Sequence, residues 1–195
     1  AASGEWGRFL QWRNSTSFGM TDPQFGLDVS FYTFELPFLR FLLGFAFAAT
    51  FIALVLGVVV HYLFGGLRLQ PKGDRATTAA QVQISITVAI FLFLKAIAYW
   101  LDRYDLVIQS SDLAGGFTGL QYTDVNAKLP ALNILMFVAV LVGLLFLLNA
   151  FRRQWIIPLI GLGLMVLTSV VVGGVYPLIV QQFQVRPTEL GRERP

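Results

Sequence analysis

The sequence contains no cysteine and a single histidine, His61, among its 195 residues. The lack of cysteine excludes a disulfide framework, a thiolate zinc site, an iron–sulfur cluster and a cysteine nucleophile within this chain. A single histidine excludes a multi-histidine metal centre. Charged residues are scarce as well, because they make up 13% of the chain, about half the share that is usual in soluble domains. An ordinary soluble domain is therefore not expected.

Recognised catalytic patterns are also missing from the sequence. It has neither a Gly-x-Ser-x-Gly nucleophile elbow nor a His-Glu-x-x-His metal helix. The net charge of +3 is too small to indicate a nucleic-acid partner. We therefore predict no catalytic residue, no metal site and no cofactor. An enzyme acting on lipid or cell-wall precursors would have to keep its active site outside this chain.

What the sequence does have is four long apolar runs, which cover residues 38–64, 82–101, 132–151 and 155–180. Each reaches the roughly 20 residues that a helix needs to cross a bilayer. Helices are expected because an unpaired strand leaves its backbone polar groups unsatisfied in lipid. The prediction is an all-α integral membrane protein with a four-helix domain over 38–180. Residues 1–37 form an interfacial segment in this prediction, and 181–195 begin an extracytoplasmic region.

The charges of the connections predict an orientation. The connection 65–81 has three basic residues and one acid, and the connection 152–154 has two arginines and no acid. The connection 102–129 instead has four aspartates against two basic residues. Because short basic loops stay in the cytoplasm, we expect the first two connections inside. Both termini and the acidic loop are then extracytoplasmic, in a protein of the cell membrane.

The N-terminal segment shows a helical pattern of its own. Trp6, Phe9, Leu10 and Arg13 have the i, i+3, i+4, i+7 spacing of one helix face. An apolar face of this kind, bounded by polar residues, is typical of a short helix that lies in the membrane interface.

Lys95 is the ionisable residue that lies deepest within an apolar run. An intramembrane charge is a functional candidate by default, but Lys95 is only six residues from the end of its run, about 9 Å at helical rise. A lysine side chain can extend that far to the interface. Two interpretations stay open: snorkelling or an ion pair with Asp102 or a loop acid, and a substrate or proton path. Arg40 is interpreted as an outer-leaflet anchor beside Glu35.

The acidic loop supplies the other candidate functional residues. The candidate polar cluster consists of Lys95, Asp102, Arg103, Asp105, Asp124 and Asn126. Its aspartates could supply oxygens to a hard cation, but their spacing matches no EF-hand loop. A solvated loop that pairs with Arg40, Lys95 or Arg103 is the preferred interpretation.

Small residues at four-residue spacing predict close helix packing. The candidates are Gly44, Ala48, Gly57, Gly143 and Gly173. The fourth run also contains Pro158 and Pro177, so a helix broken near 161–163 or 173–174 is an alternative there, of the kind that marks transporter sites.

Three stretches resemble one family of bacterial, mostly actinobacterial, membrane proteins. They read TDPQF, DVSFY and ELPF within 21–38, KAIAYWLDRY and YTDVNA within 95–127, and GVYP and QQF within 174–183. The chain is similar in these motifs, and along its whole length, to the uncharacterised protein family 0182. The resemblance implies about seven spans followed by a large extracytoplasmic region, so that this chain would be the second half of the membrane domain. It supplies no catalytic residue or ligand.

Two functional hypotheses follow from these observations. The first is a non-enzymatic membrane domain that anchors a large extracytoplasmic region, with membrane lipids and envelope proteins as partners and no nucleic acid. The alternative is a transporter or channel component whose outer polar vestibule surrounds Lys95 and the 102–129 loop. A polar cavity near the bilayer midplane would favour the second.

Overall fold

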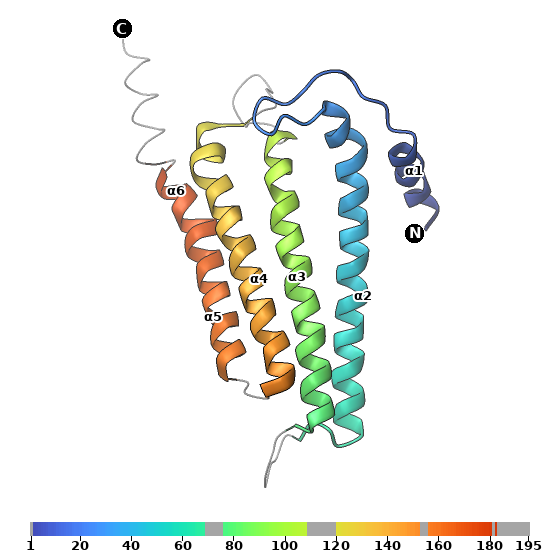
Figure 1. Cartoon of the computed structure of the whole chain (residues 1–195), viewed down its shortest axis with the longest axis vertical. Coiled ribbons are helices and arrows are strands. Elements are labelled where there is room, and N and C mark those ends of the chain that lie inside the picture. Colours follow the sequence, from blue (N-terminus) through green and yellow to red (C-terminus); the bar gives the residue numbers. More distant parts are fainter. Residues whose placement is uncertain (1, 69–75, 109–119, 153–155, 181, 183–195) are drawn as a thin grey trace.

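The computed structural model of the chain describes residues 2–68, 76–108, 120–152, 156–180 and 182. Long helices stand side by side in this part of the chain (Figure 1). The described residues form no β-strand and only two isolated bridges, Thr21 with Asp28 and Leu67 with Ala76. The predicted all-α fold is therefore confirmed.

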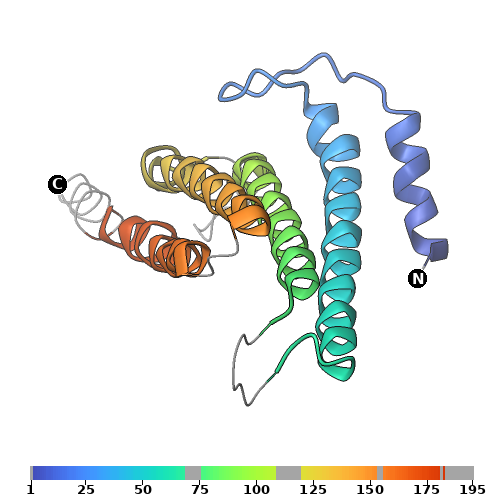
Figure 2. The same ribbon diagram turned by 60° about the horizontal axis from the view of Figure 1, so that its bottom comes forward.

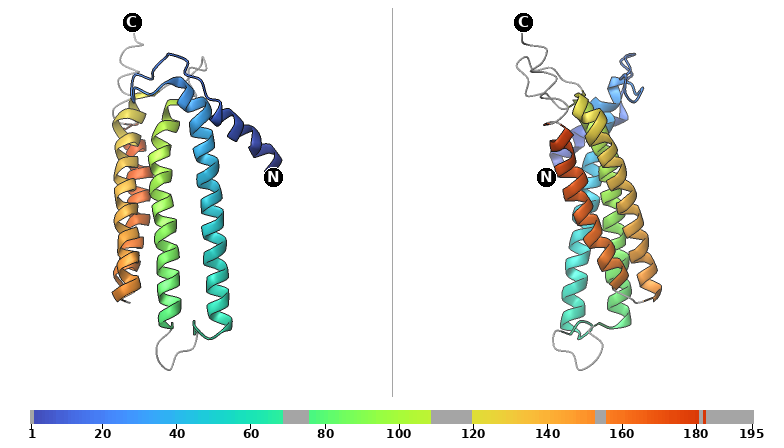
Figure 3. Two further views of the ribbon diagram at one scale, coloured as in Figure 1. Left: turned by 45° about the vertical axis from the view of Figure 1, so that its right-hand side comes forward. Right: turned by 90° about the vertical axis from the view of Figure 1, so that its left-hand side faces the viewer.

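Four helical segments are long and apolar enough to cross a membrane, as the sequence predicted. They run over Phe31–Leu63, Thr78–Ile108, Asp124–Arg152 and Ile156–Val180. The α-helices within them are α2 (Leu36–Leu63), α3 (Thr78–Ile108), α4 (Leu129–Arg152), α5 (Ile156–Val170) and α6 (Tyr176–Val180). The helix α1 (Ala2–Arg13) precedes them and leans away from the bundle beside the first turns of α2 (Figure 3).

Three of the four segments contain a π-helical turn. These turns are η1 (Phe31–Glu35) before α2, η2 (Asp124–Lys128) before α4 and η3 (Val171–Val175) between α5 and α6. All three lie toward the end of the bundle at which α2 and α4 begin. This end, which also carries Arg40, Asp102 and Asp105, is the polar end of the bundle.

The helix ends follow from local chemistry. Pro37 lies in the first turn of α2, where its missing N–H leaves no hydrogen bond unmade. Gly65 follows α2 with a φ of +71°, the left-handed conformation that commonly ends a helix. At the start of α3, the Thr77 hydroxyl accepts a hydrogen bond from the Ala80 N–H at 3.4 Å, which satisfies one free donor of the first turn.

Helical structure extends beyond three of the four apolar runs, and before the first run it begins at Phe31. The second run ends at residue 101, but α3 continues to Ile108. The third run begins at residue 132, but helical structure begins at Asp124. The predicted outer loop 102–129 is therefore shorter than expected. Hydropathy detects only the apolar length of a helix, whereas polar residues continue it wherever their side chains find partners.

The central pair of the bundle is α3 with α4. Its core contains Ala89, Leu92, Ala96 and Tyr99 from α3, Leu135, Ala139, Val142 and Phe146 from α4, and Met165 from α5. Ala89 and Ala139 are fully buried, so their small side chains let the two helices approach closely. Toward the other end of the same interface, the Asn149 Nδ2 donates to the buried Ser85 hydroxyl at 2.9 Å. This bond joins α4 to α3 between two buried side chains.

The remaining long helices pack on the two sides of this pair. The row runs α5, α4, α3, α2 (Figure 1), with α2 packed on α3 and α5 packed on α4. The row is curved, so α2 and α5 flank one face of α3 (Figure 2). At the end away from the polar end, the His61 Nε2 and the Gln83 Oε1 lie 2.9 Å apart and join α2 to α3.

The glycines expected to pack helices divide into two groups. Added Cβ atoms at Gly57, Gly143 and Gly173 would lie 2.8, 3.0 and 3.3 Å from the side chains of Gln83, Phe93 and Leu135, respectively. These three sites are close helix contacts. Gly57 and Gly143 are buried there, whereas Gly173 is exposed beside Leu135. Gly44 and Ala48 are exposed as well, and a Cβ at Gly44 would meet no described atom within 4 Å.

The fourth segment stays helical along its length. It remains α-helical across residues 161–163 and passes through the π turn η3 at residues 173–174. Pro158 and Gly161 are buried, and a Cβ added at Gly161 would lie 3.0 Å from the Leu145 side chain of α4. Close packing, rather than a helix break, therefore describes this segment.

Candidate functional site

An ion-paired bridge between α2 and α3 lies at the polar end. The Arg40 Nη2 is 2.7 Å from the Asp102 Oδ1 and also pairs with the Asp105 carboxylate. Asp102 and Asp105 are three residues apart on α3, so they lie on the same helix face. All three side chains are partly exposed, at 28%, 36% and 32% respectively. One guanidinium thus neutralises two carboxylates and ties two helices together.

This bridge changes the interpretation of three residues. Arg40 contacts α3 across the helix pair instead of serving only as an anchor beside Glu35. The sequence suggested Asp102 as a partner of Lys95, but in the structure Asp102 pairs with Arg40. None of the ion pairs between described residues includes Lys95.

Residues 17–31, which precede α2, form a tight loop around two aspartates, called the hook below. Asp28 accepts hydrogen bonds from the Ser17 hydroxyl and from the backbone N–H groups of Phe18, Gly19 and Ser30 at 3.1, 3.0 and 2.8 Å. Asp22 is buried and accepts from the N–H groups of Gln24 and Phe25 at 3.1 and 2.6 Å. Gly19 and Gly26 have φ values of +71° and +67°, which only glycine adopts freely. The hook is therefore held by backbone-to-carboxylate bonds.

The hydrogen bonds to Asp28 lower its pKa well below the ordinary aspartate range, the Ser17 hydroxyl contributing most. A lowered pKa means that the carboxylate stabilises the hook above the ordinary pKa of about 4, and that this stability is lost as the pH falls through the lower folded value. We expect Asp28→Asn to speed amide exchange at Gly19 and Ser30 at neutral pH. The difference from wild type should vanish at strongly acidic pH. Exchange at Leu43 in α2 is the internal reference, and a mutant effect that does not depend on pH would contradict the assignment.

Aromatic side chains attach the hook to α3. The Phe25 and Phe31 rings meet the Tyr104 ring edge to face, with centroids 4.9 and 5.2 Å apart. The Arg103 guanidinium lies 5.7 Å from the Phe25 ring centroid, within the range of a cation–π contact. Arg103 therefore lies against the Phe25 ring of the hook and the Tyr104 ring of α3, and it forms no ion pair with the acids of the predicted cluster among the described residues.

Asp124 begins η2 and is almost completely buried. Its carboxylate lies 2.8 Å from the Lys128 Nζ and accepts from the Gln121 N–H at 2.8 Å. The nearby Asn126 is exposed, and its Nδ2 donates to the Tyr122 carbonyl at 2.9 Å. Both residues therefore stabilise the start of their own helix.

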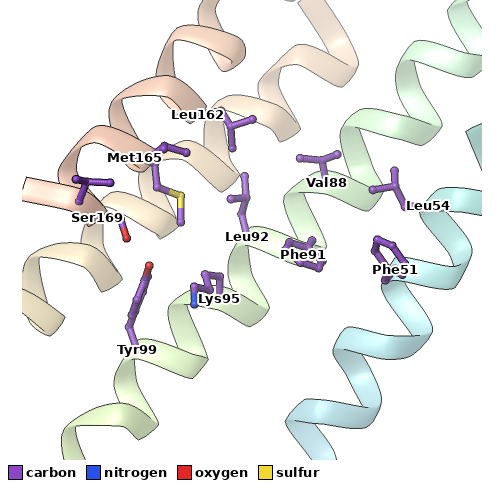
Figure 4. Close-up of a pocket in the computed structure, with 12 residues that line it drawn as sticks. Phe51, Leu54, Val88, Phe91, Leu92, Lys95, Tyr99, Leu162, Met165 and Ser169 are labelled. Atoms are coloured by element: carbon purple, nitrogen blue, oxygen red, sulfur yellow. The ribbon is translucent and has the colours of Figure 1, made fainter. Parts of the chain in front are cut away.

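Lys95 faces a groove of about 490 Å³ between α2, α3 and α5 (Figure 4). The groove is lined by Phe51, Leu54, Val88, Phe91, Leu92, Lys95, Tyr99, Leu162, Met165, Val166, Ser169 and Val170. The Lys95 Nζ lies 4.5 Å from the centroid of the Tyr99 ring. The hydroxyls of Tyr99 and Ser169 point toward the same space as this amine (Figure 4). The rest of the wall is apolar.

The candidate polar cluster is thus distributed over separate places. Asp102 and Asp105 join Arg40, Asp124 and Asn126 stay at the start of α4, Arg103 contacts the hook, and Lys95 faces the groove. The described residues contain no group of three or more histidines and acids placed to hold a metal ion. Asp112, another acid of the loop, lies outside the described residues.

Sequence reasoning included Arg40 among the expected partners of the loop acids, but it missed the roles of Asp22 and Asp28. For Arg40, a signal was present in the i, i+3 spacing of Asp102 and Asp105, which presents two acids on one face to a neighbouring cation. For the two aspartates, the signal was a local one: both precede residues whose backbone N–H groups they bind, as is common for aspartate in turns.

Known proteins match the whole of this chain. The family model described as Uncharacterised protein family (UPF0182) covers residues 1–195. UPF0182 proteins of Streptomyces coelicolor, Frankia alni and Thermobifida fusca are 52%, 51% and 50% identical to it, each match covering 100% of this chain. The chain spans only 20%, 19% and 19% of those relatives, about a fifth of their length. No solved structure matches it. By its sequence, its motifs and the extent of these matches, the chain belongs to the uncharacterised protein family UPF0182.

Proposed function

We propose that this chain is a structural membrane module, which anchors and orients an extracytoplasmic region of a larger cell-envelope protein. The observation that carries the proposal is the bridge from Arg40 to Asp102 and Asp105. It places the charges of the polar end in contact with one another, where they fix α2 against α3. Charges that are paired in this way hold two helices together and are not free to bind a passing solute, so they support a structural role.

The hook supports the same role. Its two aspartates hold the segment before α2 in shape, and its Phe25 and Phe31 rings attach it to Tyr104 near the end of α3. A module with such an ordered end offers a firm base to whatever is attached there. The chain covers about a fifth of its relatives, which is consistent with a much larger remainder to be anchored.

The proposed orientation places the polar end outside the cytoplasm. The basic connections 65–81 and 152–154 then lie inside, in accordance with the positive-inside rule. The transport hypothesis has weaker support, because the vestibule it needs would combine Lys95 with the loop acids. In the described residues, Lys95 faces an apolar groove while Asp102 and Asp105 contact Arg40.

A protease-release experiment on the full-length protein tests this proposal. A specific cleavage site is inserted after Gln182, and the protease is added outside intact cells. We expect cleavage there and release of the remainder into the soluble fraction. The matched control carries the same site after Gly66, which the proposed orientation places inside, so this site should be cleaved only after permeabilisation. Cleavage at 66 in intact cells would invert the orientation. A remainder that stays on the membrane after cleavage at 182 would contradict anchoring by this module.

A further inference from the structure

The groove that Lys95 faces combines a charged amine with an apolar wall, and an anchoring role does not explain this combination. Among its lining residues, the polar groups are the Lys95 amine and the hydroxyls of Tyr99 and Ser169. At one end of the groove the Tyr99 and Ser169 hydroxyls are turned toward each other, and the Lys95 amine lies beside the Tyr99 ring (Figure 4). Because the other lining residues are apolar, a complementary occupant needs one anionic group and an apolar chain.

The amine lies on the side of the groove nearer the polar end. Tyr99 is one helical turn beyond Lys95 along α3, in the direction of Asp102, and the Lys95 Nζ lies over its ring. The lysine side chain is therefore extended toward the membrane surface, as snorkelling predicts. An anionic headgroup at that level would pair with the amine, while the chain attached to it would run deeper along Leu92 and Met165.

The groove opens sideways, out of the bundle. Phe51, Val166 and Val170 at its edges are 57%, 59% and 58% exposed. In a bilayer these edges face lipid tails, so a lipid enters the groove from the membrane without passing through water. A soluble anion would have to cross an apolar wall to reach the same amine.

The groove is also long enough for an acyl chain. It has a volume of about 490 Å³ and runs along α3 from Val88 to Tyr99, about 16 Å at helical rise. A narrow, flexible acyl chain fits this space along its length.

We propose that the groove binds an anionic phospholipid of the leaflet at the polar end. One acyl chain lies between α2, α3 and α5, the phosphate pairs with the Lys95 amine, and the hydroxyls of Tyr99 and Ser169 donate hydrogen bonds to it. Bound in this way, the lipid fills the face of α3 that α2 and α5 flank.

Native mass spectrometry of the full-length protein in nanodiscs tests the proposal. The probes are phosphatidylglycerol, phosphatidylcholine with the same acyl chains, and glycerol phosphate without chains. We expect phosphatidylglycerol to bind at least about tenfold more tightly than phosphatidylcholine, since a hydrogen-bonded ion pair is at stake, and glycerol phosphate not to bind. Lys95→Gln should abolish this preference, and Lys95→Arg should keep it. Arg13→Gln removes the same charge from an exposed site and should leave the preference unchanged.

A second pair of variants tests the groove itself. Val166→Trp fills the groove and should release the lipid, although Lys95 is still present. Leu164→Trp places the same bulk on α5 at a residue that does not line the groove, and should not release it. Equal binding of the two lipids by wild type, or a preference that survives Lys95→Gln, would overturn the proposal. So would carbodiimide coupling of Lys95 to an acid of the protein, which would show that a carboxylate of the protein occupies the site.

Discussion

Arg40→Met is expected to loosen the contact between α2 and α3 by about 2 kcal/mol. It removes the cation shared by Asp102 and Asp105, and charge-assisted bonds are each worth roughly 1.5–3 kcal/mol, less where solvent screens them. This chain has no cysteine, so once cysteines elsewhere in the full-length protein are replaced by serine, Ala98→Cys places a single buried thiol in the apolar cluster beside the bridge. Its labelling rate in the full-length protein reports local opening and should rise roughly 30-fold.

Two further variants show whether charge or packing is responsible. Arg40→Lys should give an intermediate rate, because a single ammonium cannot hold two carboxylates with the geometry of a guanidinium. Combining Arg40→Met with Asp102→Asn and Asp105→Asn removes the uncompensated charges and should return the rate most of the way to wild type. A combined variant as labile as Arg40→Met alone would mean that the arginine acts through packing.

Phe146→Ala should give the largest loss of stability, about 3 kcal/mol. The side chain is 2% exposed in the core between α3 and α4. In a membrane the loss comes mainly from missing contacts around the cavity, because transfer of apolar groups to lipid contributes little. Labelling of a thiol at Ala139→Cys, in the same core, should become roughly a hundredfold faster.

The matched control for this change is Phe137→Ala on the same helix. Phe137 is 64% exposed, so Phe137→Ala removes the same volume as Phe146→Ala, but from the outer face of α4. We expect its effect on the labelling of Ala139→Cys to stay within about threefold, near 0.5 kcal/mol. Comparable effects of the two changes would mean that the outer face of α4 is packed in the full-length protein, and would correct the assignment of its core.

The number and class of the helices could be predicted from the sequence because both depend on local composition. A run of apolar residues as long as a bilayer is thick has few alternatives to a helix. The helix ends depend on contacts instead. Residues 102–108 continue α3, and two of them, Asp102 and Asp105, find their partner on α2. Hydropathy has no access to that partner, so it detects the apolar run that ends at residue 101 and not the polar turns of the helix that follow.

For the candidate site too, local features could be predicted and contacts between helices could not. Lys95 could be singled out because one charge in an apolar run is visible in the sequence alone. Its surroundings could not be predicted, since they come from α2 and α5 as well as from α3. Arg40 could be named as one of three possible partners of the loop acids, but the acids it contacts could not be chosen, because they are 62 and 65 residues away and no short motif records that separation. The same limit applies to the glycines. Gly143 packs closely against Phe93 and Gly44 meets no described atom, and only the neighbouring helix distinguishes the two positions.

The π turn η2 sets the direction in which Asp124 points. Asp124 and Leu135 are eleven positions apart, and eleven steps of about 100° in a regular α-helix bring a side chain back within about 20° of its starting direction. In a regular helix the carboxylate would therefore join the stripe that Leu135 and Ala139 turn toward α3. The additional residue of the π turn rotates it away by about a quarter of a turn, to where it pairs with Lys128. Deleting one residue within η2 would restore the regular phase, and the carboxylate would then be directed into the apolar interface of α3 and α4.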